Sequence, residues 1–401
     1  MMHCLHKTFL LMVFVCSIAG GTTSASDGRI RIGQVDMPLE IYQSGSYVLT
    51  ESLTVTGGPA IVVSANHVTI DLAGHSIRNV GAQVGSSGIS VAFLETYGLR
   101  VHNGALVNFG DGVFLGNHSR AENLRLSLVR RAFRLGEGSM VSNVQVIDCD
   151  FANEGVVSPG SMLFDISVAG GLPAMASFVY YQLQGANRVD NFRLSGIHAT
   201  DASLGVSIMS VGRGSAISRV QLVDNSMLNT SFTGIQMTES LLTDSRISDI
   251  RADDFNVTGL NMTRSMAVRS SVNNATSASS GYGMIVTDSM LTDCQMQGGF
   301  SGLAYSILST GSRASGNLVK GPNWDIRGTP NILRDNHIIT TNAYGFIGQQ
   351  TANHLLVRNS AAGAATDFIS TANSTNHFAL VQQFPGTNYV FNNNTWANIR
   401  Y

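Results

Sequence analysis

The sequence predicts an all-β protein: a single-stranded, right-handed parallel β-helix (a solenoid) of about fourteen coils with an N-terminal cap. Three observations predict this fold. The chain repeats itself with a period in the low twenties, apolar and polar residues alternate over short runs, and the composition favours turns. The 401 residues include 42 Gly but only two Lys, and 12% of them are charged. Such a composition is typical of a turn-rich β protein.

The repeat is clearest in the middle of the chain. GIQMTESLLTDSRI occurs at 234–247, GLNMTRSMAVRSSV at 259–272 and GMIVTDSMLTDCQM at 283–296, at offsets of 25 and 24 residues. A small residue recurs at one position of these copies, and weaker copies extend the pattern in both directions. We assign to this small position His75, Gly104, Cys149, Ser195, Asn225, Ser245, Ser270, Cys294, Gly316, Asn336, Ser360 and Asn394. Such a period indicates a solenoid, whose coils bury a continuous core by stacking on one another.

Each repeat contains short strands and tight turns. VTIDL at 68–72 and RVQLV at 219–223 alternate apolar and polar residues, which indicates strands with one buried face. Pairs such as Asp-Asn and Asp-Ser follow the strands and favour turns. Each repeat is therefore expected to form one coil of two or three strands. Because parallel crossover connections are overwhelmingly right-handed, the solenoid is expected to be right-handed too.

The first 25 residues are predicted to be a signal peptide. Lys7 precedes the apolar run FLLMVFVCSI at 9–18, which is too short to span a bilayer, and small residues follow at 23–25. We expect residues 26–60 to form the N-terminal cap and opening segment, and residues 61–401 to form the β-helix. The protein is then extracytoplasmic, either secreted or periplasmic, with no membrane span after cleavage.

The two cysteines outside this leader, Cys149 and Cys294, are expected to be buried free thiols. In the predicted alignment they are about six coils apart, which is ~29 Å at ~4.8 Å per strand. A disulfide tolerates at most ~7 Å between Cα atoms, so no bridge is expected between them.

One segment resembles a known family. Residues 45–81, GSYVLTESLTVTGGPAIVVSANHVTIDLAGHSIRNVG, are similar to the N-terminal part of secreted bacterial β-helix proteins of the pectate-lyase-like (pectin lyase fold) superfamily. The string N-x-V-T-I-D-L-x-G-H-x-I at 66–77 is its most specific part. The resemblance extends roughly over residues 40–400 and implies the fold. It implies no single activity, because this architecture hosts lyases, hydrolases, esterases and adhesins.

Acidic residues form the first group of candidate site residues. Asp224, Asp244, Arg269 and Asp293 are expected in one column, together with Asp148 and Asp335. Neighbouring outward carboxylates would lie ~5 Å apart, so Asp224 and Asp244 are candidate Ca²⁺ ligands. By analogy with pectate lyases, an Arg beside these carboxylates could serve a uronate lyase, so the catalytic candidates are Asp224, Asp244, Arg269 and Asp293. The alternative, which we favour, is that these residues stabilise turns. No cofactor is required, and calcium is an optional ligand.

Aromatic and basic residues form the second group, as candidates for substrate binding. In FVYYQL at 178–183, Phe178 and Tyr180 are expected on one face of a strand and Tyr181 on the other. Exposed rings would stack on sugars, whereas the alternative is that they pack in the core. A basic cluster comprises Arg120, Arg125, Arg130, Arg131 and Arg134. It is suited to an anionic glycan, because Arg binds carboxylates in a bidentate manner, or it is simply a solvated face.

The catalytic motifs of related enzymes are missing. The sequence has no R-I-K or Q-D-T-L string, no nucleophile elbow and no Cys or His cluster at metal-ligand spacing. The net charge of −2 gives no reason to expect nucleic acid as a partner. We therefore predict an exported β-helix protein that binds a polysaccharide or cell-surface glycan, with binding favoured over cleavage. The alternatives are a non-catalytic adhesion module and a Ca²⁺-dependent uronate lyase; an enzyme would be a polysaccharide lyase or a glycoside hydrolase. The oligomeric state stays open.

Overall fold

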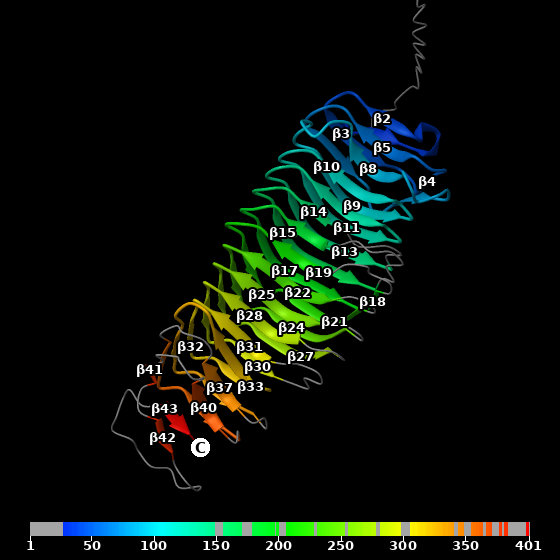
Figure 1. Cartoon of the computed structure of the whole chain (residues 1–401). Helices are drawn as coiled ribbons and strands as arrows, with labels where there is room; N and C mark the ends of the chain where they lie inside the picture. Colours follow the sequence, from blue (N-terminus) through cyan, green and yellow to red (C-terminus); the bar gives the residue numbers. More distant parts are fainter. Residues whose placement is uncertain are drawn as a thin grey trace, which may run out of the picture.

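The structure is a computed structural model of the 401-residue chain. It describes residues 27–148, 155–170, 179–196, 198–199, 206–227, 231–252, 256–277, 281–297, 305–340, 344–348, 354–363, 366–370, 377–378, 381–383 and 398–400. These residues form one elongated right-handed solenoid, in which successive coils stack along a single axis (Figure 1). The prediction of an all-β parallel β-helix is confirmed, because every strand pairing among the described residues is parallel.

Two stacked sheets make up the solenoid. The first has fifteen strands, one from each coil, against the roughly fourteen coils that the sequence predicts. Its strands are β2 (Leu39–Ile41), β5 (Pro59–Val63), β8 (Ser87–Val91), β10 (Asp111–Leu115), β12 (Arg131–Leu135), β14 (Gly155–Val157), β16 (Val179–Leu183), β19 (Val206–Val211), β22 (Phe232–Thr238), β25 (Val257–Thr263), β28 (Gly281–Thr287), β31 (Tyr305–Thr310), β34 (Trp324–Arg327), β37 (Tyr344–Gly348) and β40 (Thr366–Ser370).

The second sheet has 28 strands, because most coils cross it in two segments with a bend between them. Its strands are β1 (Ile30–Ile32), β3 (Gly45–Leu49), β4 (Leu53–Val55), β6 (Val68–Asp71), β7 (Ser76–Asn79), β9 (Arg100–Val107), β11 (Arg120–Ser127), β13 (Met140–Ile147), β15 (Met162–Ala169), β17 (Arg188–Ser195), β18 (His198–Ala199), β20 (Ala216–Ser218), β21 (Gln221–Met227), β23 (Leu241–Thr243), β24 (Arg246–Ala252), β26 (Met266–Val268), β27 (Ser271–Ser277), β29 (Met290–Thr292), β30 (Gln295–Gln297), β32 (Arg313–Ser315), β33 (Leu318–Lys320), β35 (Ile332–Arg334), β36 (His337–Ile339), β38 (Leu355–Val357), β39 (Ser360–Ala362), β41 (His377–Phe378), β42 (Val381–Gln383) and β43 (Asn398–Arg400).

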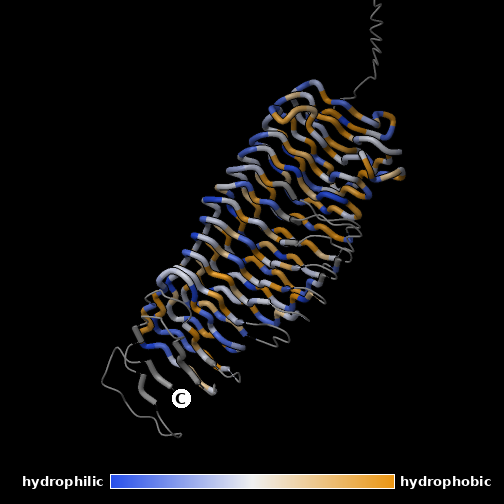
Figure 2. The backbone as a smooth tube through the Cα atoms, in the orientation of Figure 1, coloured by the Kyte–Doolittle hydropathy of each residue, from blue (hydrophilic) through white to orange (hydrophobic). Residues whose placement is uncertain are grey.

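The core is one continuous column of apolar side chains inside the coils. Leu242, Ala267 and Leu291 occupy the same inward position in three successive coils and are buried. Apolar residues recur at matching places along the axis, which is visible as aligned stripes in Figure 2. Each coil buries its inner face only against its neighbours, so the equivalent inward position of every coil has to be apolar. This explains why the apolar residues of the repeat recur while the polar ones vary.

Residues with left-handed backbone conformation form the bends between segments. Asp244, Arg269 and Asp293 have φ of 50°, 47° and 51°, and each is followed by a buried small residue. The predicted column of small residues is confirmed at Ser245, Ser270, Cys294 and Asn336, all of which are buried.

Elsewhere the predicted column needs correction. Gly316 is a left-handed bend residue with φ of 67°, and its neighbour Asn317 is the buried one. The Nδ2 of Asn336 donates to the Oδ1 of Asn359, so these two residues belong to the same row. In that row Asn359 is buried, and the predicted Ser360 is not. Asn225 is buried at a different bend, in register with Ile250.

Cys294 is a buried free thiol, as expected, and burial raises its pKa to about 11. Cys149 lies outside the described residues.

The opening segment already belongs to the solenoid. β1 pairs with β3, and β2 pairs with β5, so residues from 30 onward contribute strands to both sheets. Its short 3-10 helix η1 (Gln34–Asp36) is the one helical element among the described residues. The predicted signal peptide lies outside the described residues. No helix in the described part of the chain is long and apolar enough to cross a membrane.

Candidate binding face on the fifteen-stranded sheet

The outer face of the fifteen-stranded sheet is lined by short polar side chains in the middle coils. Each strand turns some side chains outward, with two buried residues between the outward pair in β22, and the parallel register stacks these side chains into rows. Two such rows contain Ser207, Thr233, Thr258, and Ser210, Gln236, Asn261. The Oγ of Ser207 donates to the Oε1 of Gln236 at 3.2 Å, so the rows are linked to each other. Ser207 and Thr258 are only 8% exposed, so the more exposed members of the rows, such as Gln236, offer the donors and acceptors to a polar ligand.

Towards the N-terminus these rows end in a cluster on β10 and β12. The Nε and Nη2 of Arg131 donate to the two carboxylate oxygens of Asp111 at 2.5 and 3.0 Å. The guanidinium of Arg134 lies over the ring of Phe114, with its Cζ 4.3 Å from the ring centroid. The cluster therefore presents an aromatic ring, a carboxylate and two cations on one surface.

Towards the C-terminus a second cluster lies on β28, β31 and β34. The rings of Tyr282 and Tyr305 stack with centroids 5.9 Å apart and an interplanar angle of 11°. The guanidinium of Arg327 lies 5.2 Å from the centroid of Tyr305, and its Nη2 donates to the Tyr305 hydroxyl at 3.1 Å. This cluster again combines aromatic rings with a cation, and both tyrosines are partly exposed.

Asp325 sits beneath the second cluster and has no exposed surface. The Nε of Arg327 donates to its Oδ2 at 2.5 Å, whereas its Oδ1 has no hydrogen-bond partner among the described residues. Burial raises the pKa of Asp325 above its usual value, and the hydrogen bond from Arg327 offsets only part of that effect. Buried polar atoms are nearly always hydrogen-bonded, so a carboxylate with a free oxygen marks a place where a ligand or a proton is expected.

The predicted basic cluster is divided among three parts of the coil. Arg131 and Arg134 lie on the outer face of β12, in the cluster with Asp111. Arg120 and Arg125 lie on β11 of the other sheet, and Arg130 lies at the bend that leads into β12. The five arginines are close along the chain, but they do not form the single predicted cluster, because the bends turn them towards different faces.

The predicted aromatic residues fall partly outside the described residues. Phe178 lies outside the described residues. The backbones of Tyr180 and Tyr181 form part of β16 in the fifteen-stranded sheet, but their side chains are not described. Tyr181 is in register with Met209 of β19.

The acidic candidates occupy two different bends. Asp244, Arg269 and Asp293 follow one another in a column, and Arg269 donates to both oxygens of Asp244 at 2.7 and 2.9 Å. This hydrogen bond holds the pKa of Asp244 below its usual range. Asp224 is not part of that column, because its strand register sets it beside Asp249. Within the described ranges no three His, Cys, Asp or Glu residues group as metal ligands, and calcium stays a prediction.

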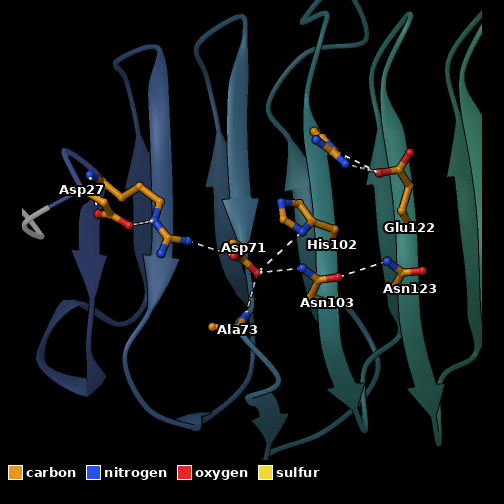
Figure 3. A network of polar contacts seen from close by, with 9 residues as sticks. Asp27, Asp71, Ala73, His102, Asn103, Glu122 and Asn123 are labelled. Carbon is orange, nitrogen blue, oxygen red and sulfur yellow. Dashed lines mark hydrogen bonds and ion pairs between the residues drawn. The ribbon is translucent and has the colours of Figure 1, made fainter.

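The column that contains Asp244 forms a ladder of polar contacts at the N-terminal end of the solenoid, which Figure 3 shows. Asn123 donates to the Oδ1 of Asn103 at 3.1 Å, and Asn103 donates to Asp71 at 3.3 Å. Asp71 also accepts from the backbone of Ala73 at 2.9 Å and from Arg29 at 3.0 Å. The contacts in this column thus link one coil to the next, as expected for residues that stabilise bends.

Sequence reasoning missed Asp111, Phe114, Tyr282, Tyr305 and the Asp325–Arg327 pair. A usable signal was present, because Tyr282 and Tyr305 precede the matching strings TDS and STGS at similar distances in consecutive repeats. Aromatic residues at the same phase of neighbouring repeats are expected to stack on one face.

Comparison with known proteins gives a likeness of fold alone. No family model and no curated protein matches the sequence. Among solved structures, the tailspike of E. coli bacteriophage HK620 in complex with a pentasaccharide is 9% identical with a TM-score of 0.44, covering 83% of this chain and 71% of that chain. The Streptococcus pneumoniae surface protein and adhesin PfbA is 11% identical with a TM-score of 0.36, covering 82% and 90%.

Proposed function

We propose that this protein binds a polysaccharide on the outer face of the fifteen-stranded sheet. The observation that carries this proposal is the cluster of Tyr282, Tyr305, Arg327 and Asp325, in which stacked, partly exposed rings adjoin a guanidinium and a carboxylate. Aromatic rings supply flat apolar contact area for the faces of sugar rings, and the partly exposed guanidinium of Arg327, held by the buried Asp325, donates to sugar hydroxyls. These residues, and not the similarity of fold, support glycan binding.

The two clusters define the extent of the proposed site. From β10 to β34 the sheet passes through nine strand-to-strand steps, which corresponds to ~43 Å at ~4.8 Å per step. The polar rows of Ser, Thr, Gln and Asn lie between the clusters. A face of this length suits an extended chain of sugars that contacts aromatic residues at two separated points.

Truncation of Tyr305 tests the proposal. Full-length protein is titrated with a panel of neutral and uronate polysaccharides, with and without Ca²⁺, and the best ligand is then titrated into Tyr305→Ala. We expect its Kd to rise about tenfold, since one stacking contact is lost from the centre of the cluster. Tyr42→Ala is the matched control, because Tyr42 is 69% exposed and lies far along the axis, after β2. Equal loss in both variants, or no binding by any polysaccharide, would refute the proposal.

Cleavage of the bound glycan is a second candidate function. Asp325 favours it, because burial raises the pKa of its carboxyl, which can then give a proton to a leaving group once ligand binding uncovers the side chain. The same titrations distinguish the two functions, since an enzyme would release shorter saccharides while an adhesion module would leave the polysaccharide intact. Dependence of that release on Ca²⁺ would favour a lyase.

Export is part of the proposal and rests on the leader at 1–25. Fractionation of cells that express the full chain tests it. We expect the protein outside the cytoplasm with an N-terminus near residue 26.

A further inference from the structure

A hollow of about 330 Å³ lies at the N-terminal end of the solenoid, at the bend where β10 leads into β11. His67, Thr69, Gly98, Arg100, His118 and Arg120 line it. We name it the basic hollow. None of the charged side chains that line it is acidic.

The coil repeat explains why the hollow exists. His67, Gly98 and His118 are left-handed bend residues, with φ of 55°, 71° and 51°, and their backbones follow one another in consecutive coils. Gly98 has no side chain to fill the space between the two imidazoles; a Cβ there would lie 2.9 Å from the Nδ1 of His67. The two imidazole-bearing positions are two coils apart, which is ~10 Å.

Two arginines border the same space. Arg100 and Arg120 are the first residues of β9 and β11 and are in direct register, with Thr69 in the coil before them. Arg100 donates to Glu122 at 2.7 and 2.9 Å, and Figure 3 shows Glu122 facing this contact. The guanidinium of Arg120 has no ion pair or hydrogen bond with any residue that the structure describes. One guanidinium is therefore left without a counter-charge at the edge of the hollow.

We propose that the basic hollow binds one oxyanion group, and that this group is the sulfate or carboxylate of an acidic glycan held on the neighbouring sheet face. Arg donates two parallel N–H bonds to such a group, and imidazole and hydroxyl groups add further donors. His118 lies four residues after Phe114, a span of at most ~14 Å, so the hollow is one bend away from the N-terminal cluster of the proposed binding face. The identity of the anion's carrier rests on the proposed function, whereas the oxyanion site does not.

The test titrates sodium sulfate, glucose 6-sulfate and glucose into the full-length protein at constant ionic strength. We expect saturable binding of sulfate, tighter binding of glucose 6-sulfate, and an increase of about tenfold in both Kd values for Arg120→Ala. Arg125→Ala is the matched control, because Arg125 is exposed on the same strand, has no charged partner among the described residues and does not line the hollow. We expect its Kd values to stay within about twofold of wild type.

Each remaining outcome is decisive. Absence of saturable sulfate binding, or equal weakening in Arg120→Ala and Arg125→Ala, overturns the oxyanion site. Glucose 6-sulfate that binds no more tightly than sulfate overturns the assignment to a glycan. Neither result affects the Tyr305→Ala experiment, since Tyr305 lies at the other end of the sheet.

Discussion

At the scale of single residues, Asp325 is a carboxyl whose surroundings oppose its charge. Its carboxyl is buried, and burial raises its pKa above the ordinary value of 3.8. Well below pH 3.8 the carboxyl is neutral in both the folded and the unfolded chain, so its contribution to stability is fully present. As the pH rises, the carboxyl ionises first in the unfolded chain, so the folded state progressively loses this stabilisation. The loss is complete once the pH exceeds the folded pKa.

Asp325→Asn removes this titration and gives the first prediction at this scale. We expect the variant to gain free energy of unfolding relative to wild type between pH 4 and pH 7, as measured by urea unfolding at each pH. Asp244→Asn is the control with the opposite sign. The hydrogen bond from Arg269 lowers the pKa of Asp244, so its stabilisation is present above the unfolded pKa and is lost as the pH falls. A pH-independent difference for Asp325→Asn would contradict the assignment.

Single residues are also where sequence reasoning was least accurate. The residue at each bend and the buried residue after it are both small or polar, so Gly316 and Asn317 suit either place by composition. Only φ and burial separate them. Asp224 and Asp244 were placed in one column because both bends use the same local chemistry, an Asp followed by Asn or Ser. The strand register assigns them to different bends.

At the scale of elements, buried side chains at the bends hold one coil to the next. Asn336 is the best-connected example. Its Oδ1 accepts from the backbone N of Asn317 at 3.1 Å and from its Nδ2 at 2.7 Å. Its Nδ2 donates to Ala314 O at 3.0 Å and to the Oδ1 of Asn359 at 2.9 Å. The side chain thus satisfies backbone groups that the strands themselves leave free.

Asn336→Ala tests this role. The change leaves a buried backbone N–H and a buried carbonyl without partners, so we expect it to lower the free energy of unfolding by about 2–4 kcal/mol. Asn273→Ala is the control: Asn273 lies on β27 and makes one long side-chain contact, 3.5 Å to the Oγ of Ser271. Its cost should stay within about 0.5 kcal/mol, as for most surface changes. Similar costs for the two variants in urea unfolding would show that the buried contacts do not hold the coils.

The strands themselves were predictable from alternation, within a residue or two. VTIDL at 68–72 contains β6, which spans Val68–Asp71. RVQLV at 219–223 was expected to be one strand, but β21 begins at Gln221. The reason is that Arg219 adopts φ of 52° and bends the chain just before the strand. Arginine rarely takes this conformation, so this bend could not be predicted from the residue type.

At the scale of the whole molecule, the polar residues that differ between repeats follow a pattern of charge. Consecutive coils carry acidic, basic and acidic residues at the same two bends. These pairs are Glu239 and Asp244, Arg264 and Arg269, Asp288 and Asp293. Ion pairs join the coils, with Glu239 and Arg264 at 2.9 Å and Asp244 and Arg269 at 2.7 Å. A slip of register by one coil would oppose like charges, so the alternation favours a single stacking order.

The period therefore made the fold predictable, whereas the site depends on information that no period contains. Which outward residues meet depends on where each coil bends and how long its connections are. Tyr305 and Arg327 are 22 residues apart and in contact, whereas Arg120 and Arg131 are 11 apart and on different sheets. Only the register of all the coils resolves such cases.

Reversal of one charge in this alternation gives the last prediction. Arg269→Glu would place three acidic residues in consecutive coils, with Asp244 before and Asp293 after the new side chain. We expect a lower melting temperature at low salt, and partial recovery at about 0.5 M salt, where the Debye length shortens to a few ångströms. Arg246→Glu is the matched control, because Arg246 is exposed on the neighbouring strand and faces Gln221 and Ser271 in register. Since it has no charged neighbour in that row, its melting temperature should change little at any salt concentration. A loss in Arg269→Glu that is independent of salt, or that is matched by Arg246→Glu, would mean that shape and burial alone set the stacking order of the coils.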